Sequence, residues 1–138
     1  MNTISAGAGE FSLDHGIDQM HRESEQWMSA INFWKLELKF FQKLLDLHAH
    51  KFVGIVDKKK IDHFQNLITY YTGELLDVFF KEVRQHEKLL AETIMRDAEF
   101  DEGQYIVLHG TVGSRINSFA TEYRMYKKEF IQFIDQVI

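Results

Sequence analysis

The chain contains neither cysteine nor proline among its 138 residues. Without cysteine it can form no disulfide bond, thiolate metal site or thiol nucleophile. Proline breaks the interior of a helix, so its absence permits very long helices. Basic residues are outnumbered, with 16 Lys and Arg against 21 Asp and Glu, which gives a net charge of −5. This balance disfavours nucleic acids and anionic membrane surfaces as partners, because both require a basic surface.

Long hydrophobic runs are also missing from the sequence. It has no window of about 18 uncharged apolar residues, as a membrane-spanning helix would need. The N-terminus lacks the basic start and the apolar stretch of a signal peptide, so we expect a cytoplasmic protein. Apolar residues nevertheless make up 45% of the chain and include 12 Phe, 5 Tyr and 2 Trp. A single domain of this length can therefore bury a substantial core.

The strongest pattern is a run of apolar residues between Met20 and Phe52. Steps of four and three residues separate its members, as they do along one face of a long helix that packs against partner helices. We predict a helix at 18–52, with Asp14 or Asp18 as its N-cap and Gly54 as a left-handed residue that ends it. The seam consists of Met20, Trp27, Ile31, Trp34, Leu38, Phe41, Leu45 and Phe52.

Two later stretches repeat the spacing and predict helices at 58–98 and 102–136, each preceded by a short turn. Asp57 is placed to cap the first of these helices. The stripe of the second follows nearly perfect heptads and consists of Tyr105, Leu108, Val112, Ile116, Phe119, Tyr123, Tyr126, Phe130, Phe133 and Val137.

Gly73, Gly110 and Gly113 lie in the interior of these predicted helices, where each costs about 1 kcal/mol relative to alanine. The apolar stripe keeps its phase across Gly73, so we predict one continuous helix there. Gly110 and Gly113 leave two alternatives open. Either the first half of the last helix frays, or the glycines let the side chain of Trp27 or Met28 approach closely.

Short turns between long helices force alternating directions. The fold class is therefore predicted as all-α, an antiparallel up-down-up bundle of three long helices. Residues 17–138 form a single domain in this interpretation. Residues 1–16, which are rich in Gly, Ala and Ser, form a flexible N-terminal arm.

The first predicted helix carries more apolar residues than one seam requires. Phe33, Phe40, Leu44 and Leu47 flank its seam, and Phe79 and Phe80 are adjacent on the second helix. A slim core of three helices cannot hide all of them, so we predict self-association, with a homodimer as the expected form. In the alternative interpretation these side chains lie half-buried along the seams.

Seven histidines are the only side chains that suit catalysis or metal binding. Short turns place His48 and His63 level with one another near the first turn. A second set lies at the opposite end of the predicted bundle and consists of His21, Glu25, His86, Glu92 and His109. Imidazole and carboxylate ligands suit Zn, Fe or Mn inside a bundle. The same histidines can instead serve as helix caps or as buried hydrogen-bonding groups.

Patterns for other chemistry are missing. The glycines form no phosphate loop and the serines lie in no nucleophile elbow. The Glu-x-x-His pair of ferritin-like di-metal bundles does not occur. The leading hypothesis is therefore a non-enzymatic interaction or structural module that dimerises and docks a protein partner. A metal-binding bundle is the alternative, and a small apolar ligand held between aromatic-rich helices is a third idea.

Overall fold

The computed structural model describes residues 13–95 and 102–138. These residues are almost entirely helical and contain no strand, which confirms the predicted all-α class. No helix within these ranges is long and apolar enough to cross a membrane. The elements are α1 (Leu13–His48), the 3-10 turn η2 (Ala49–Lys51), α2 (Ile55–Tyr70), the π-helical segment η3 (Tyr71–Leu75), α3 (Leu76–Met95) and α4 (Glu102–Asp135).

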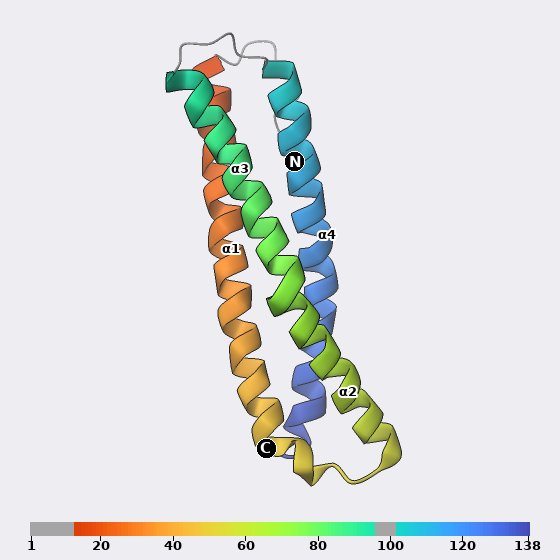
Figure 1. The fold of residues 1–138 in the computed structure, drawn as a ribbon. Coiled ribbons are helices and arrows are strands. Elements are labelled where there is room, and N and C mark those ends of the chain that lie inside the picture. The colour runs from red at the N-terminus through yellow and green to blue at the C-terminus, as the bar shows by residue number, and fades with distance from the viewer. Residues whose placement is uncertain (1–12, 96–101) are drawn as a thin grey trace.

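The helices lie side by side along one long axis (Figure 1). The chain runs down α1, returns through α2, η3 and α3, and runs down again along α4. α1 packs against both the α2–α3 rod and α4, and α3 packs against α4. We call the end where α1 finishes and α2 begins the aromatic end. The end where α1 and α4 begin is the histidine end.

The first turn differs from the prediction in its details. α1 begins at Leu13 and ends at His48, because η2 tightens the chain before Phe52. Gly54 does not adopt the left-handed conformation that was expected of a helix stop. Its φ of −78° and ψ of 153° are extended, and it is the N-cap of α2 in place of Asp57. Its carbonyl accepts a hydrogen bond from the backbone N–H of Lys58 at 3.0 Å.

The rod from α2 to α3 is uninterrupted, in agreement with the prediction of one helix across Gly73. Gly73 lies in the π-helical segment, a geometry that accommodates one additional residue in a helical turn. Nothing lies within 4 Å of a Cβ placed at Gly73, so no close helix crossing explains this glycine. The predicted end of this helix at residue 98 lies outside the described residues.

Aromatic side chains form most of the main core. The ring of Phe130 is fully buried, with its centroid 4.8 Å from that of Phe41 and 5.4 Å from that of Phe64. Phe52 and Phe133 stack at 4.1 Å. Such ring pairs contribute about 0.5–1.5 kcal/mol each beyond the burial of their surface. They hold the aromatic end together.

The core at the histidine end is much smaller. Met20, Leu90 and Tyr105 form a separate cluster, against which Ile17 packs. Buried polar side chains occupy the neighbouring positions, and these are Ser24, His86 and His109. The helices at this end are therefore joined by polar contacts as well as by apolar packing.

Gly113 explains how α1 and α4 approach each other near this end. A Cβ atom at residue 113 would lie 2.8 Å from Cζ2 of Trp27, which is closer than side chains pack. α4 is continuous through Gly110 and Gly113, so this half of the helix is intact. Of the two alternatives left open by the sequence, the structure supports close approach of Trp27 at Gly113. Gly110 has nothing within 4 Å of such a Cβ.

Candidate functional site

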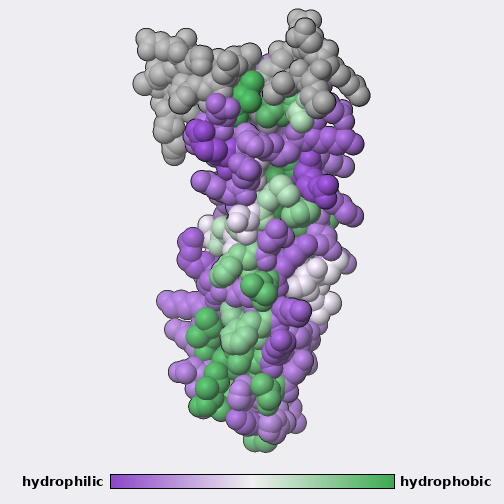
Figure 2. Space-filling model, turned by 90° about the vertical axis from the view of Figure 1, so that its left-hand side faces the viewer, coloured by the Kyte–Doolittle hydropathy of each residue, from purple (hydrophilic) through white to green (hydrophobic). Residues whose placement is uncertain are grey.

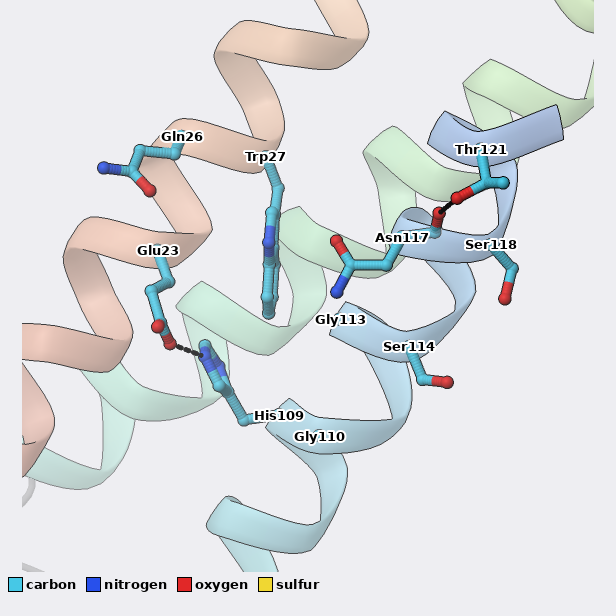
Figure 3. Close-up of a pocket in the computed structure, with 10 residues that line it drawn as sticks. All are labelled: Glu23, Gln26, Trp27, His109, Gly110, Gly113, Ser114, Asn117, Ser118 and Thr121. Carbon is cyan, nitrogen blue, oxygen red and sulfur yellow. Dashed lines mark hydrogen bonds and ion pairs between the residues drawn. The ribbon is translucent and has the colours of Figure 1, made fainter. Parts of the chain in front are cut away.

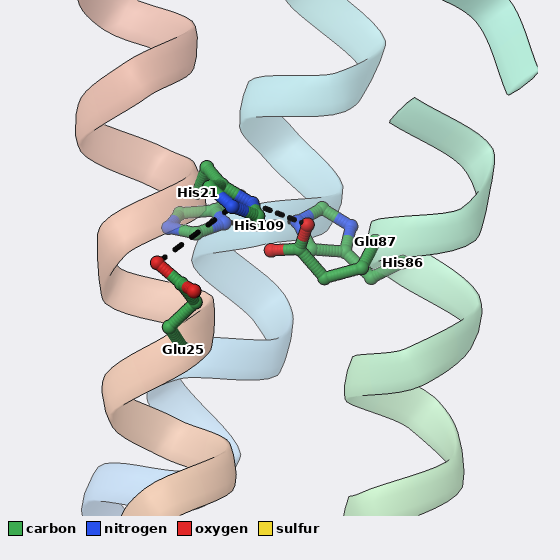
Figure 4. Close-up of polar contacts among 5 residues, drawn as sticks. All are labelled: His21, Glu25, His86, Glu87 and His109. Carbon is green, nitrogen blue, oxygen red and sulfur yellow. Dashed lines mark hydrogen bonds and ion pairs between the residues drawn. The ribbon is translucent and has the colours of Figure 1, made fainter. Parts of the chain in front are cut away.

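The structure brings three of the predicted site histidines together at the histidine end (Figure 4). His21 comes from α1, His86 from α3 and His109 from α4. Nε2 of His86 lies 2.9 Å from Nδ1 of His109, and Nε2 of His109 lies 2.8 Å from Oε1 of Glu23. A continuous polar chain, Glu23–His109–His86, therefore links all three long helical rods.

Aromatic rings enclose this chain on both sides. The ring of Trp27 stacks on His109 with centroids 4.5 Å apart, and Tyr105 stacks on His86 at 4.3 Å with planes only 9° apart. His86 is 2% exposed and His109 is 7% exposed. The stacking fixes the orientation of both imidazoles, because neither ring can rotate without displacing an aromatic neighbour.

Burial sets the protonation of His86. Desolvation lowers its pKa from 6.5 to about 4, and the neighbouring His109 acts in the same direction, whereas Glu87 opposes the shift. His86 is therefore neutral at pH 7. Its Nδ1 atom is buried and has no hydrogen-bond partner among the described residues. Burial also raises the pKa of Tyr105 well above its ordinary value, with the charge of Glu87 adding to the effect.

His21 and Glu25 lie at the outer edge of the same layer. Nδ1 of His21 is 2.7 Å from Oε2 of Glu87, and its Nε2 is 3.6 Å from Oε1 of Glu25. The hydrogen bond with Glu87 raises the pKa of His21, against a small opposing effect of burial. The side chain of His21 is about half exposed, so water screens this ion pair.

Glu92 does not join the cluster. It lies 3.8 Å from Lys88, one turn earlier on α3. The sequence placed Glu92 level with His109, whereas the structure places His86 there. The difference of six residues corresponds to about 9 Å of sliding between α3 and α4. The prediction assumed a symmetric turn around residue 100 and so misjudged this register.

Glu23 was missed by the sequence analysis. It reaches His109 from α1, two residues beyond the predicted ligand His21. It precedes Trp27 by four residues and therefore shares a helix face with the indole that stacks on His109. That shared face was the available signal for its role.

The other predicted pair, His48 and His63, is not assembled into a site. Nδ1 of His48 lies 3.0 Å from Nζ of Lys51. His63 is exposed, and its ring lies beside that of Phe64 at 6.1 Å. Within the described ranges the two histidines make no hydrogen bond or ring contact with each other.

No set of three or more His, Cys, Asp or Glu side chains in residues 13–95 and 102–138 is arranged to hold a metal ion. Binding of Zn, Fe or Mn therefore stays a prediction from the sequence. His86 and His109 hydrogen-bond to each other, so an ion that bound to both imidazoles would require them to move apart. The carboxylate of Glu23, which hydrogen-bonds to His109, would then orient this imidazole as a metal ligand.

A groove lies next to this layer, between α1 and α4 (Figure 3). Its volume is about 680 Å³, and it is open to solvent. Glu23, Gln26 and Trp27 line it from α1, and His109 together with small or polar residues lines it from α4. The α4 residues are Gly110, Gly113, Ser114, Asn117, Ser118 and Thr121.

Exposed apolar side chains form a row on α1 toward the aromatic end. We define the outer row as Phe33, Leu36, Phe40 and Leu47, which are 57%, 65%, 56% and 63% exposed. Their spacing of three, four and seven residues places them on one face of the helix. Figure 2 shows apolar side chains gathered toward the aromatic end of the face that it presents.

The predicted excess of apolar surface is thus found on α1 and only partly elsewhere. Leu44 and Phe80 are half-buried against the core. Phe79 is buried, with its ring 5.7 Å from that of Phe119. The expectation that Phe79 contributes to an exposed surface is therefore wrong, because it belongs to the seam between α3 and α4.

Comparisons of the chain with protein-family models, curated proteins and solved structures give no match.

Proposed function

We propose that this protein is a non-enzymatic interaction module that binds another helix through the outer row of α1. The observation that supports this proposal is the exposure of four large apolar side chains on one face of a helix whose opposite face is fully buried. Surfaces of this kind on a folded protein are typical of binding sites. The homodimer expected from the sequence is one candidate for what covers the row.

The size of the row is sufficient for docking. An aromatic side chain offers roughly 150–250 Å² of surface, so each half-exposed Phe of the row leaves about 100 Å² in contact with water. The four side chains together leave on the order of 400 Å², which is within the range of functional patches. Covering this area is worth about 10 kcal/mol before the costs of association are subtracted.

The polar chain at the histidine end fits a structural role in this proposal. Glu23, His109 and His86 hydrogen-bond to one another in series between aromatic rings, and only Nδ1 of His86 lacks a partner among the described atoms of this chain of contacts. Their burial leaves the neutral His86 without access to bulk solvent. We infer that the chain fixes the relative position of the three rods.

Sedimentation equilibrium tests the homodimer directly. Phe40→Glu places a charge in the centre of the outer row. The control variant Met125→Glu places a charge on α4, at a side chain that is 63% exposed. If the row mediates self-association, the molar mass rises with concentration for the unaltered protein and for Met125→Glu only. A monomer at every concentration removes the homodimer. Failure of every helical peptide to bind as well would contradict the proposed function as a whole.

A metal-binding bundle is the second candidate. The specific observation in its favour is that imidazoles from two helices, His86 and His109, lie side by side with the carboxylate of Glu23 behind His109. A bound ion would replace the hydrogen bond between the two imidazoles. Elemental analysis of untagged protein, with thermal shifts on adding Zn, Mn or Fe, tests it. Stoichiometric metal that is lost in His109→Gln supports this function. Absence of metal together with no thermal shift excludes it.

A further inference from the structure

The outer row has a basic rim on a protein that is acidic overall. Lys39 and Lys43 lie on one side of the row on α1, three residues after Leu36 and Phe40 respectively. Both lysines are exposed, and neither forms an ion pair in the part of the chain that the structure describes. This side of the row is therefore positively charged.

The opposite side of the row faces α4 and is basic as well. Lys127 of α4 pairs with Glu37 of α1 at 3.2 Å, which places this stretch of α4 next to the row. Arg124 and Lys128 lie within one turn of Lys127, are exposed and form no ion pair within the described ranges. Four unpaired basic side chains thus flank the row, although the net charge of the chain is −5.

Two acidic side chains of α1 lie beside the row, and they offset only part of this charge. Glu37 accepts hydrogen bonds from the hydroxyl of Tyr123 at 2.7 Å and from Lys127, so these two charges balance each other. Asp46 accepts a hydrogen bond from the neutral Gln42 at 2.9 Å and keeps its negative charge, on the side of α1 that faces α2. With four unpaired basic side chains against this one carboxylate, the charge beside the outer row is positive.

We infer that the outer row binds an acidic amphipathic helix of a partner protein, an inference that rests on the proposed function. The row from Phe33 to Leu47 spans about 21 Å, which matches roughly four turns of a docked helix. Apolar residues of the partner at helical spacing cover the row. Its Glu and Asp residues flank them and face Lys39, Lys43, Arg124 and Lys128, as charges do beside a helical seam.

The same rim argues against two other occupants. Pairing two copies through this row brings two basic rims together, which repulsion opposes. An anionic membrane would attract the rim, but the rest of the chain has more acidic than basic residues, and this net negative charge opposes a close approach. An acidic helix meets neither obstacle, because it contacts the row and its rim alone.

Two designed helical peptides with the same leucine seam test the inference, one with Glu at the flanking positions and one with Lys. Fluorescence anisotropy should show tighter binding of the acidic peptide, with affinity falling as salt is added. In Lys39→Glu/Lys43→Glu the affinity for the acidic peptide should fall roughly tenfold, and the basic peptide should gain affinity. Phe40→Glu should bind neither peptide, and Val107→Glu, at an exposed side chain near the start of α4 and away from the rim, should bind as the unaltered protein does.

Each contrary outcome has a distinct meaning. Equal binding of both peptides overturns the acidic partner and leaves the proposed function intact. Binding of neither peptide, by a protein that is also monomeric, removes the proposed function and this inference together. Tighter binding to phosphatidylserine vesicles than to the acidic peptide assigns the surface to a membrane. Self-association through the row that excludes the peptide assigns it to a second copy. Both of these outcomes overturn the inference.

Discussion

The two ends of the bundle are built from the same helices but are held together by different interactions. At the aromatic end, rings such as Phe64 and Phe130 fill the space between the rods. At the histidine end, His86 and His109 occupy the equivalent interior positions and bond to each other. The comparison teaches that helical spacing determines which positions are buried, whereas the residue type at those positions determines how stable each end of the bundle is.

Buried polar atoms without a hydrogen-bond partner make the two ends differ in stability. Within the described residues, buried atoms of Ser24, His86 and Glu87 at the histidine end have no hydrogen-bond partner. Each such atom costs about 1–3 kcal/mol. In the main aromatic core of the described residues, the hydroxyl of Tyr71 is the one buried atom of this kind. We therefore expect the aromatic end to be the more stable of the two.

The surfaces of the two ends differ in the same way. The groove beside Trp27 and His109 is lined by small and polar side chains. The outer row at the aromatic end presents Phe33, Leu36, Phe40 and Leu47 to solvent. A partner helix therefore finds apolar side chains at helical spacing along the outer row, whereas the exposed Ile106, Val107 and Leu108 of the histidine end are consecutive residues that point in different directions around α4.

The largest loss of stability is expected from a substitution in the core of the aromatic end. Phe130→Ala removes a fully buried ring, which should lower the free energy of unfolding by about 3–5 kcal/mol. Met20→Ala at the histidine end should cost less, because its cluster contains only two other buried residues. Urea denaturation of both variants measures the difference. An equal or greater loss at Met20 would refute the ranking of the two ends.

Acid should weaken the histidine end through His86. Its pKa is about 4 in the folded protein against an ordinary 6.5, so between these values the unfolded chain binds the proton and the folded one does not. Stability therefore falls as the pH drops from 6.5 to 4, by about 3 kcal/mol. Denaturation at a series of pH values should show this loss, and His86→Gln should abolish most of it.

Two controls isolate that effect. His63→Gln changes an exposed histidine and should leave the pH dependence unaltered. His21 acts with the opposite sign, because Glu87 raises its pKa. The stabilisation that His21 contributes to the folded protein is present below pH 6.5 and is lost as the pH rises through the raised pKa of His21. An unchanged pH dependence in His86→Gln would show that this imidazole is not the responsible group.

The two glycines of α4 give a smaller and more specific contrast. Gly113→Ala places a Cβ against Trp27 and should destabilise the protein by about 1–3 kcal/mol. Gly110→Ala meets nothing and should stabilise it by up to about 1 kcal/mol through helix propensity. Thermal denaturation compares them. If both substitutions stabilise, the close approach of Trp27 is not a constraint.

The sequence was sufficient for the fold because hydrophobic spacing determines it. Leu38, Phe119 and Tyr123, which the spacing placed in the core, are all buried. The same spacing contained a signal that was not used. Steps of four and three lead from Tyr105 through His109 to Val112, whereas the prediction chose the apolar Leu108, which is 39% exposed.

The candidate site was only partly predictable because it depends on register. The spacing of α3 and α4 fixes their faces but not how far one helix slides along the other, so Glu92 was placed where His86 lies. The sequence also did not determine which flank of α1 remains exposed to solvent. Phe40 and Phe79 look alike as flanking residues, yet only Phe79 packs into a seam.

The smallest expected effect concerns a surface ion pair that links α1 to α3. Nζ of Lys35 lies 2.6 Å from Oδ1 of Asp77, and this contact lowers the pKa of Asp77. Because both side chains contact water, which screens the pair, Asp77→Asn should leave the free energy of unfolding nearly unchanged. Denaturation in low and high salt checks this, and a larger loss would show that the pair holds the two helices together.

Methyl NMR of leucine-labelled protein, titrated with the acidic helical peptide, tests the binding surface most directly. The account predicts that the methyl signals of Leu36 and Leu47 shift and saturate, while those of the buried Leu38 and Leu76 remain in place. Shifts confined to leucines outside α1, or no shift at any peptide concentration, would contradict the assignment of the outer row as the site of interaction.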